Sequence, residues 1–111
     1  MKARDIATLV CLEYGIGHNE MFSNRRAAHI SGPRQIAYFL TYHMTNLSYP
    51  EIGHVFGRDH TSIMHGVKRV DEKLARDRDL RKRVARLMDE VRNPICEGEA
   101  MAWEHSSYFA L

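Results

Sequence analysis

The sequence has no apolar run that approaches the roughly 20 residues needed to span a bilayer. The amino-terminal segment also meets Asp5 and then Glu13 too early for the apolar stretch of a secretory signal peptide. We therefore expect no membrane association and a soluble, cytoplasmic protein.

Cysteine is scarce: Cys11 and Cys96 are far apart and form no CxxC or Cys/His ligand pattern. This spacing argues against both a disulfide framework and a zinc module. The seven histidines include no HExxH motif. His60 and His65 are five residues apart, which would put them about 140° apart around a helix. We expect no metal and no other cofactor.

Catalytic and nucleotide-binding motifs are missing as well. The sequence has no GxSxG motif, so Asp59, Ser62 and His65 are not expected to form a hydrolytic triad. None of the seven glycines belongs to a GxxxxGK[ST] motif, which would cradle the phosphates of a nucleotide. The prediction is a protein that is not an enzyme and binds no nucleotide.

The charge of the chain is distributed unevenly. Residues 1–92 hold all 16 lysines and arginines and 11 of the 14 acidic residues, a net charge of +5. Residues 93–111 hold three glutamates and no basic residue, a net charge of −3. A basic body of this kind is weak support for a polyanionic partner, because inert surfaces often carry a similar balance.

Apolar residues recur at helical spacing in the amino-terminal half. A first helix is predicted from Asp5, as a candidate N-cap, to Tyr14, and residues 18–22 add one short turn. Residues 23–33 contain turn-forming residues and no sustained period, which predicts a loop. Pro33 then suits the first turn of a central helix that continues to about residue 45.

The carboxyl-terminal half carries clear helix boundaries. Ser48 and Glu51 have the spacing of a capping box, so a short helix should begin there and stop near Gly57. Asp59 offers the N-cap of a second helix, whose inner stripe is Ile63, Val67, Val70 and Leu74.

A last helix should follow, with Asp77 or Asp79 as its cap and Pro94 at its end. No segment alternates as a strand does, so the fold class is predicted to be all-α, a compact bundle of five to six helices. Residues 1–92 are expected to form one domain, followed by the acidic, partly apolar tail 93–111.

The stretch FGRDHTSIMHG, residues 56–66, has an unusual composition for a buried helix or an ordinary solvent face. If Ile63 points into the core, then Thr61, Ser62, His65 and Arg69 point largely outward. Such short polar groups, together with Arg58, Asp59 and His60 at the start of the helix, suit the reading of base edges in the major groove.

The longer stretch LSYPEIGHVFGRDHTSIMHGVKRV, residues 47–70, closely resembles the signature of the DNA-binding domain of the bacterial initiator family DnaA. The likeness continues upstream through PRQIAYFLTYHMT, residues 33–45, and FSNRRAAHI, residues 22–30. It covers roughly residues 3–92 and is far more specific than a lone short motif. The resemblance implies a Trp repressor-like helical bundle that contains a helix-turn-helix.

The resemblance also implies roles for individual residues. Base reading in the major groove of a DnaA box would fall to Arg58, Asp59, His60, Thr61, Ser62 and His65. Arg26, with Arg25 beside it, matches the loop arginine that enters the minor groove. Arg34 and Gln35 match phosphate-contacting positions, and Pro50 lies where the bracing helix meets the backbone. Double-stranded DNA is therefore the expected partner, with nucleoid-associated, cytoplasmic localisation.

The sequence departs from the family pattern at several positions. Ser62 replaces the usual second threonine and lacks its methyl group, while Ala28 and Gly32 stand where basic residues often occur. A full initiator also carries an ATPase, for which these 111 residues leave no room. The initial methionine and the residues beyond Val91 favour a stand-alone relative over a fragment. Its expected role is to regulate replication initiation or transcription.

The tail supports a rival hypothesis. Its apolar residues are unusual for a disordered acidic tail. They are Met101, Trp103, Tyr108, Phe109 and Leu111. The alternative is therefore a helical interaction or dimerisation module that uses the tail to hold a protein partner, such as the full-length initiator, or a second copy of the chain.

Overall fold

The computed structural model describes residues 2–23 and 27–92. In these two ranges the chain forms helices and no strand, which confirms the all-α prediction. The helices are α1 (Ala3–Tyr14), α2 (His18–Met21), α3 (Ala28–Met44), α4 (Tyr49–Phe56), α5 (His60–Arg76) and α6 (Arg78–Arg92). None of the described helices is long and apolar enough to cross a membrane.

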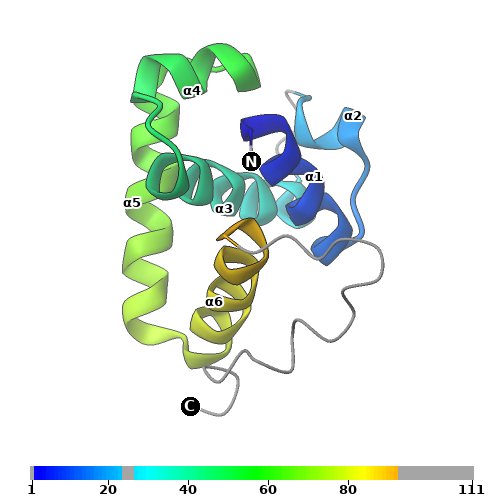
Figure 1. The fold of residues 1–111 in the computed structure, drawn as a ribbon, viewed down its shortest axis with the longest axis vertical. Coiled ribbons are helices and arrows are strands. Elements are labelled where there is room, and N and C mark those ends of the chain that lie inside the picture. The colour runs from blue at the N-terminus through cyan, green and yellow to red at the C-terminus, as the bar shows by residue number, and fades with distance from the viewer. Residues whose placement is uncertain (1, 24–26, 93–111) are drawn as a thin grey trace.

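α3 is the central helix of the bundle. It packs against α1, α5 and α6 and also contacts α2 and α4 (Figure 1). Along its length it buries Ile36, Ala37, Tyr38, Phe39 and Leu40. A helix that is apolar around most of its circumference can be stable only when neighbours cover it on several sides, which explains its central position.

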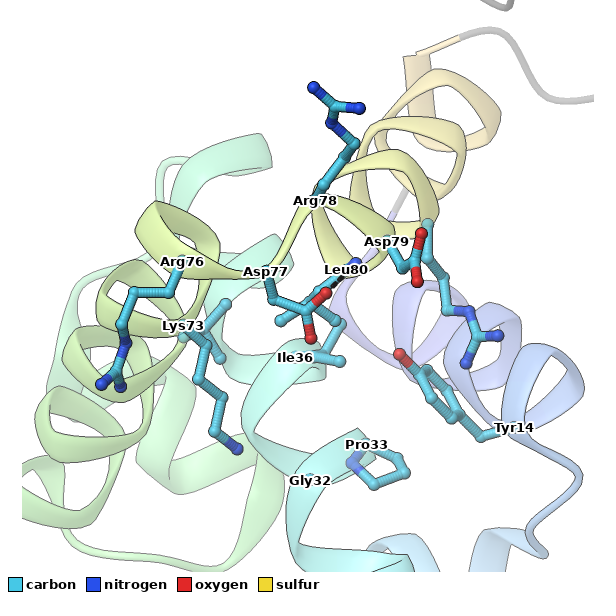
Figure 2. Close-up of a pocket in the computed structure, with 12 residues that line it drawn as sticks. Tyr14, Gly32, Pro33, Ile36, Lys73, Arg76, Asp77, Arg78, Asp79 and Leu80 are labelled. Atoms are coloured by element: carbon cyan, nitrogen blue, oxygen red, sulfur yellow. Dashed lines mark hydrogen bonds between the residues drawn. The ribbon is translucent and has the colours of Figure 1, made fainter.

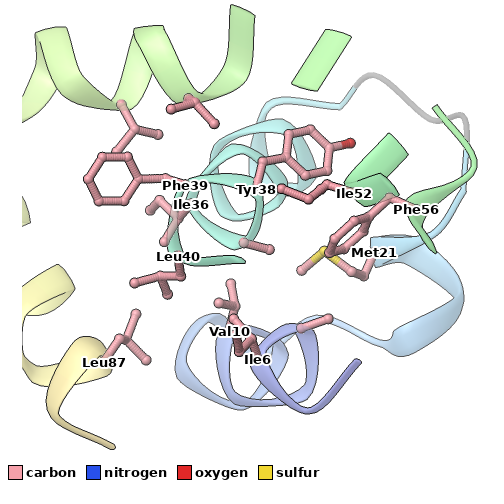
Figure 3. Close-up of a cluster of buried hydrophobic side chains, with 14 of the residues drawn as sticks. Ile6, Val10, Met21, Ile36, Tyr38, Phe39, Leu40, Ile52, Phe56 and Leu87 are labelled. Carbon is pink, nitrogen blue, oxygen red and sulfur yellow. The ribbon is translucent and has the colours of Figure 1, made fainter. Parts of the chain in front are cut away.

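The core is one continuous cluster to which every helix contributes. Figure 3 shows Ile6 and Val10 of α1 facing α3, with Leu87 of α6 approaching from another side. The inner stripe predicted for α5 is confirmed: Ile63, Val67 and Val70 are buried, and Leu74 packs against the cluster.

Two predicted helix starts were wrong. α1 begins at Ala3, and Asp5 lies in its first turn, where its carboxylate accepts a hydrogen bond from the Lys2 backbone amide at 3.3 Å. α3 begins at Ala28, so the predicted loop 23–33 is helical in its second half and Pro33 lies inside the helix. Burial explains the longer α3, because Ile30 is fully buried and holds the additional turn against the core.

The other boundaries agree with the sequence signals. Gly15 and Gly57 adopt left-handed conformations at φ +65° and +69°, directly after α1 and α4. Asp77 caps α6, since its Oδ1 accepts a hydrogen bond from the Leu80 amide at 3.0 Å. Pro94 and the tail lie outside the described residues.

Candidate nucleic-acid interface

A tight connection joins α4 to α5. The backbone amide of Arg58 donates to the Gly53 carbonyl at 2.8 Å, and Gly57 between them has the left-handed conformation that ends α4. Gly53 has no room for a side chain, because a β-carbon there would overlap the carbonyl oxygen of Arg58. Only Arg58 and Asp59 then separate Gly57 from α5, so the two helices are held in a fixed helix-turn-helix arrangement.

The amino-terminal part of α5 presents its polar side chains to solvent. Asp59 occupies the N-cap position, although its side chain makes no capping hydrogen bond. The exposed positions here are Asp59, His60, Thr61, Ser62 and His65, and Arg69 is exposed further along the helix. The predicted outward orientation of this face is therefore confirmed. Figure 1 shows that α4 and the start of α5 lie at the opposite end of the molecule from the turn between α5 and α6.

The first turn of α4 is fixed by the predicted capping box. The Glu51 amide donates to the Ser48 hydroxyl at 3.3 Å, and the Ser48 amide donates to Oε1 of Glu51 at 2.9 Å. The hydrogen bonds from the Ser48 backbone and hydroxyl lower the pKa of Glu51. Pro50 lies exposed in this turn. The bracing helix thus begins at a defined place beside α5.

Arg58 is placed differently from the other residues of the RDHTS stretch. It is half-buried, and its Nη2 donates to the backbone carbonyl of Ser23 at 2.6 Å. Base reading by Arg58, which the family resemblance implies, would require this guanidinium to face the groove. In this structure the guanidinium instead links the turn before α5 to Ser23, two residues after the end of α2.

Arg34 also differs from its expected position at the surface. Only 6% of the residue is exposed, and its Nε donates to the Met21 carbonyl at 3.1 Å. Its Nη2 donates to the Glu20 carbonyl at 3.0 Å and to the Ser23 hydroxyl at 3.4 Å. Burial lowers the pKa of the guanidinium, and the nearby charge of Arg58 acts in the same direction. These contacts turn Arg34 inward toward α2, whereas a phosphate contact requires an outward guanidinium.

The remaining predicted residues are Gln35, which the structure describes, and Arg25 and Arg26, which it does not. Gln35 is half-buried next to Arg34. Ser23 and Gly53 were not predicted. The close approach at Gly53 has a weak sequence signal in the glycine itself, whereas nothing in the sequence marks Ser23, because its partner Arg58 is 35 residues away.

A pocket of about 670 Å³ lies at the other end of α5 (Figure 2). Its lining combines apolar residues such as Pro33 and Ile36 with basic side chains, including Lys73 and Arg83, and with the carboxylates of Asp77 and Asp79. This mixed charge favours no one class of ligand, and the pocket is remote from the exposed start of α5. The described residues contain no group of three side chains placed to hold a metal ion.

A short helix, a glycine-containing turn and a second helix with an exposed polar amino-terminal face define a helix-turn-helix protein. The model of the family described as "Bacterial dnaA protein helix-turn-helix" matches residues 3–70. The chain belongs to this family, whose helix-turn-helix is a DNA-binding domain. The match includes α1 to α4 and most of α5.

Similar curated proteins agree with this assignment. The chromosomal replication initiator protein DnaA of Rhizobium meliloti is 41% identical over 81 residues, which are 72% of this chain and 17% of that protein. The protein of the same name from Bradyrhizobium sp. is 34% identical over 94 residues, 84% of this chain and 20% of that protein. The chain thus spans about a fifth of the length of these relatives.

Proposed function

We propose that the protein binds double-stranded DNA sequence-specifically at DnaA-box-like sites and thereby regulates replication initiation or transcription. The observation that carries the proposal is the exposed row of short polar side chains at the start of α5, on a helix fixed by the Gly53 turn. The protein would regulate either by competing with the full-length initiator for DnaA boxes or by recruiting the initiator to them.

The proposed base readers are Asp59, His60, Thr61, Ser62 and His65. Aspartate can accept a hydrogen bond from cytosine N4, and the threonine methyl group suits the methyl group of thymine. Because these side chains are short and the helix is rigid, little conformational entropy is lost when they bind.

The DNA backbone would be contacted around this reading helix. Pro50 and Arg69 are exposed on α4 and α5, and Gln35 lies near the head of α3. Arg25 and Arg26 are proposed to contact the adjacent minor groove, as the family resemblance implies. Phosphate contacts set the register and base contacts set the sequence, so both kinds are required for a specific site.

Binding of labelled duplexes, followed by fluorescence anisotropy at fixed salt, tests this proposal. A duplex with a DnaA box and a scrambled duplex of equal composition form the matched pair. We expect the box duplex to bind at least about 10³-fold more tightly, the lower end of the range for specific over non-specific complexes. Equal affinity for both duplexes would exclude base reading.

A further inference from the structure

Two arginines, Arg34 in α3 and Arg58 in the turn before α5, converge on Ser23. Arg58 donates to the Ser23 carbonyl at 2.6 Å, and Arg34 donates to the Ser23 hydroxyl at 3.4 Å. The hydroxyl also donates to the Glu20 carbonyl at 2.9 Å. Ser23 is therefore held through both its backbone and its side chain, immediately before residues 24–26.

These bonds lie in a partly desolvated environment. Arg34 is almost fully buried, and both guanidinium groups are close enough to Tyr38 to oppose the rise that burial causes in its pKa. Charge-assisted hydrogen bonds are short and roughly twice as strong as neutral ones, and a buried charge is tolerated only when such bonds satisfy it. Both charged groups donate hydrogen bonds to Ser23 and so fix its position.

Aromatic packing fixes the same junction from the other side. The ring of Phe22 stacks on that of Phe56, the last residue of α4, with centroids 5.2 Å apart. Phe56 in turn meets Tyr38 of α3 edge-on at 5.0 Å. Phe22 and Ser23, which follow α2, are thus joined to the helix-turn-helix by ring stacking and by the hydrogen bond from Arg58, although they are far from it in sequence.

We propose that Arg58 and Arg34 are positioning residues that set the place of the chain entering residues 24–26 relative to the start of α5. The inference rests on the proposed function, in which Arg25 and Arg26 contact the minor groove while α5 reads the major groove. Arg58, at the start of the reading helix, then fixes the spacing between the two contacts. Arg58 thus affects sequence specificity through its hydrogen bond to Ser23 and makes no contact with a base itself.

The experiment uses a modified base that changes one groove only. Replacing one adenine of the box by 2,6-diaminopurine adds an amino group to the minor groove and leaves the major-groove edge of the pair as it was. We expect the wild-type protein to lose affinity about tenfold or more when this change falls at the minor-groove site.

The Arg58→Ala variant should bind the unmodified box more weakly than the wild type does. Its affinity should fall by less than about a further twofold on the modified duplex, because its minor-groove contact would already be impaired. Ser23→Ala removes the hydroxyl and with it the contacts to Arg34 and to the Glu20 carbonyl, but keeps the backbone carbonyl that Arg58 binds, so its loss of affinity on the modified duplex should lie between those of the wild type and Arg58→Ala. The control His65→Ala should weaken binding but keep the wild-type response to diaminopurine. Thermal melting of each variant shows whether it is folded, and Arg58→Met, which keeps an unbranched side chain but cannot donate to the Ser23 carbonyl, replaces Arg58→Ala if that variant fails to fold.

The possible results separate the two proposals. If Arg58 variants respond to diaminopurine as strongly as the wild type, the positioning role is wrong. If the wild type tolerates diaminopurine at every adenine of the box yet still prefers the box over a scrambled duplex, the inference fails and the proposed function stands. Equal wild-type affinity for box and scrambled duplexes overturns both.

Discussion

At the scale of single residues, the exposed face of α5 decides whether the protein reads sequence. His60 and Thr61 are exposed in its first turn. We predict that replacing either residue by alanine reduces the difference in binding free energy between box and scrambled duplexes by about 1–3 kcal/mol. Anisotropy titrations with both duplexes measure this difference.

The histidine His43, near the end of α3, provides a matched control, because it is exposed but lies on a different helix. His43→Ala should leave the discrimination between duplexes unchanged. A similar loss of discrimination in His43→Ala and His60→Ala would show that the effect does not arise from the reading face.

A second prediction concerns Glu51 and pH. The pKa of Glu51 is lower in the folded protein than in the unfolded chain. Its contribution to stability is therefore fully present above the pKa of the unfolded chain, about 4.3, and is lost as the pH falls through the pKa of the folded protein. The free energy of unfolding of the wild type should therefore fall relative to that of Glu51→Gln as pH is lowered from about 6 to 3. Urea denaturation at several pH values measures the difference, and a constant difference over this range would contradict the prediction.

The orientation of the two arginines marks the limit of prediction from sequence at this scale. The outward direction of Thr61, Ser62 and His65 followed from helical periodicity, because Ile63 fixes the phase of α5. Arg34 and Arg58 carry no comparable signal, since their partners come from the α2 segment and are brought near only by the tertiary fold.

At the scale of elements, the turn between α4 and α5 depends on the close approach at Gly53. A β-carbon here would overlap backbone atoms of Arg58, which cannot move without displacing α5. We predict that Gly53→Ala destabilises the protein by about 1–3 kcal/mol and weakens DNA binding beyond the effect on folding. Denaturant unfolding and duplex titration of the same variant separate the two effects.

Gly32→Ala is the matched control, because a β-carbon at this helical glycine meets no atom within 4 Å. Alanine is a better helix former than glycine by about 1 kcal/mol, so this variant should be as stable as the wild type or more so. If Gly53→Ala were equally harmless, the close approach would not be what fixes the turn.

Helix boundaries were predictable where a local signal decides them. The Ser48–Glu51 capping box and Gly57 act within a few residues and fix both ends of α4, and Asp59 occupies the N-cap position of α5 without a side-chain capping hydrogen bond. Pro33 misled the prediction because proline favours the first turn of a helix but is tolerated further inside when burial compensates. The burial of Ile30 and of Pro33 itself is a tertiary effect with no local sequence signature.

At the scale of the whole molecule, removing the acidic, partly apolar tail 93–111 tests the rival hypothesis of an interaction module. If this segment holds a second copy, the full chain should sediment as a dimer and a chain ending at Arg92 as a monomer. Sedimentation with and without box DNA measures this directly. Monomeric behaviour of both chains, with unchanged DNA affinity, would count against the rival.

Pro33 has a further consequence for how the central helix opens. Proline lacks an amide hydrogen, so the ladder of backbone bonds in α3 is interrupted at the carbonyl of His29. The burial of Ile30 and the hydrogen bonds from the Ile30 and Ser31 amides to the Ala27 carbonyl hold the first turn of α3. Local opening of residues 28–32 should need less free energy than opening of the half after Pro33, so their amide protons should exchange with solvent sooner. The helix at the centre of the bundle would then unzip in two stages, beginning at the end that follows residues 24–26.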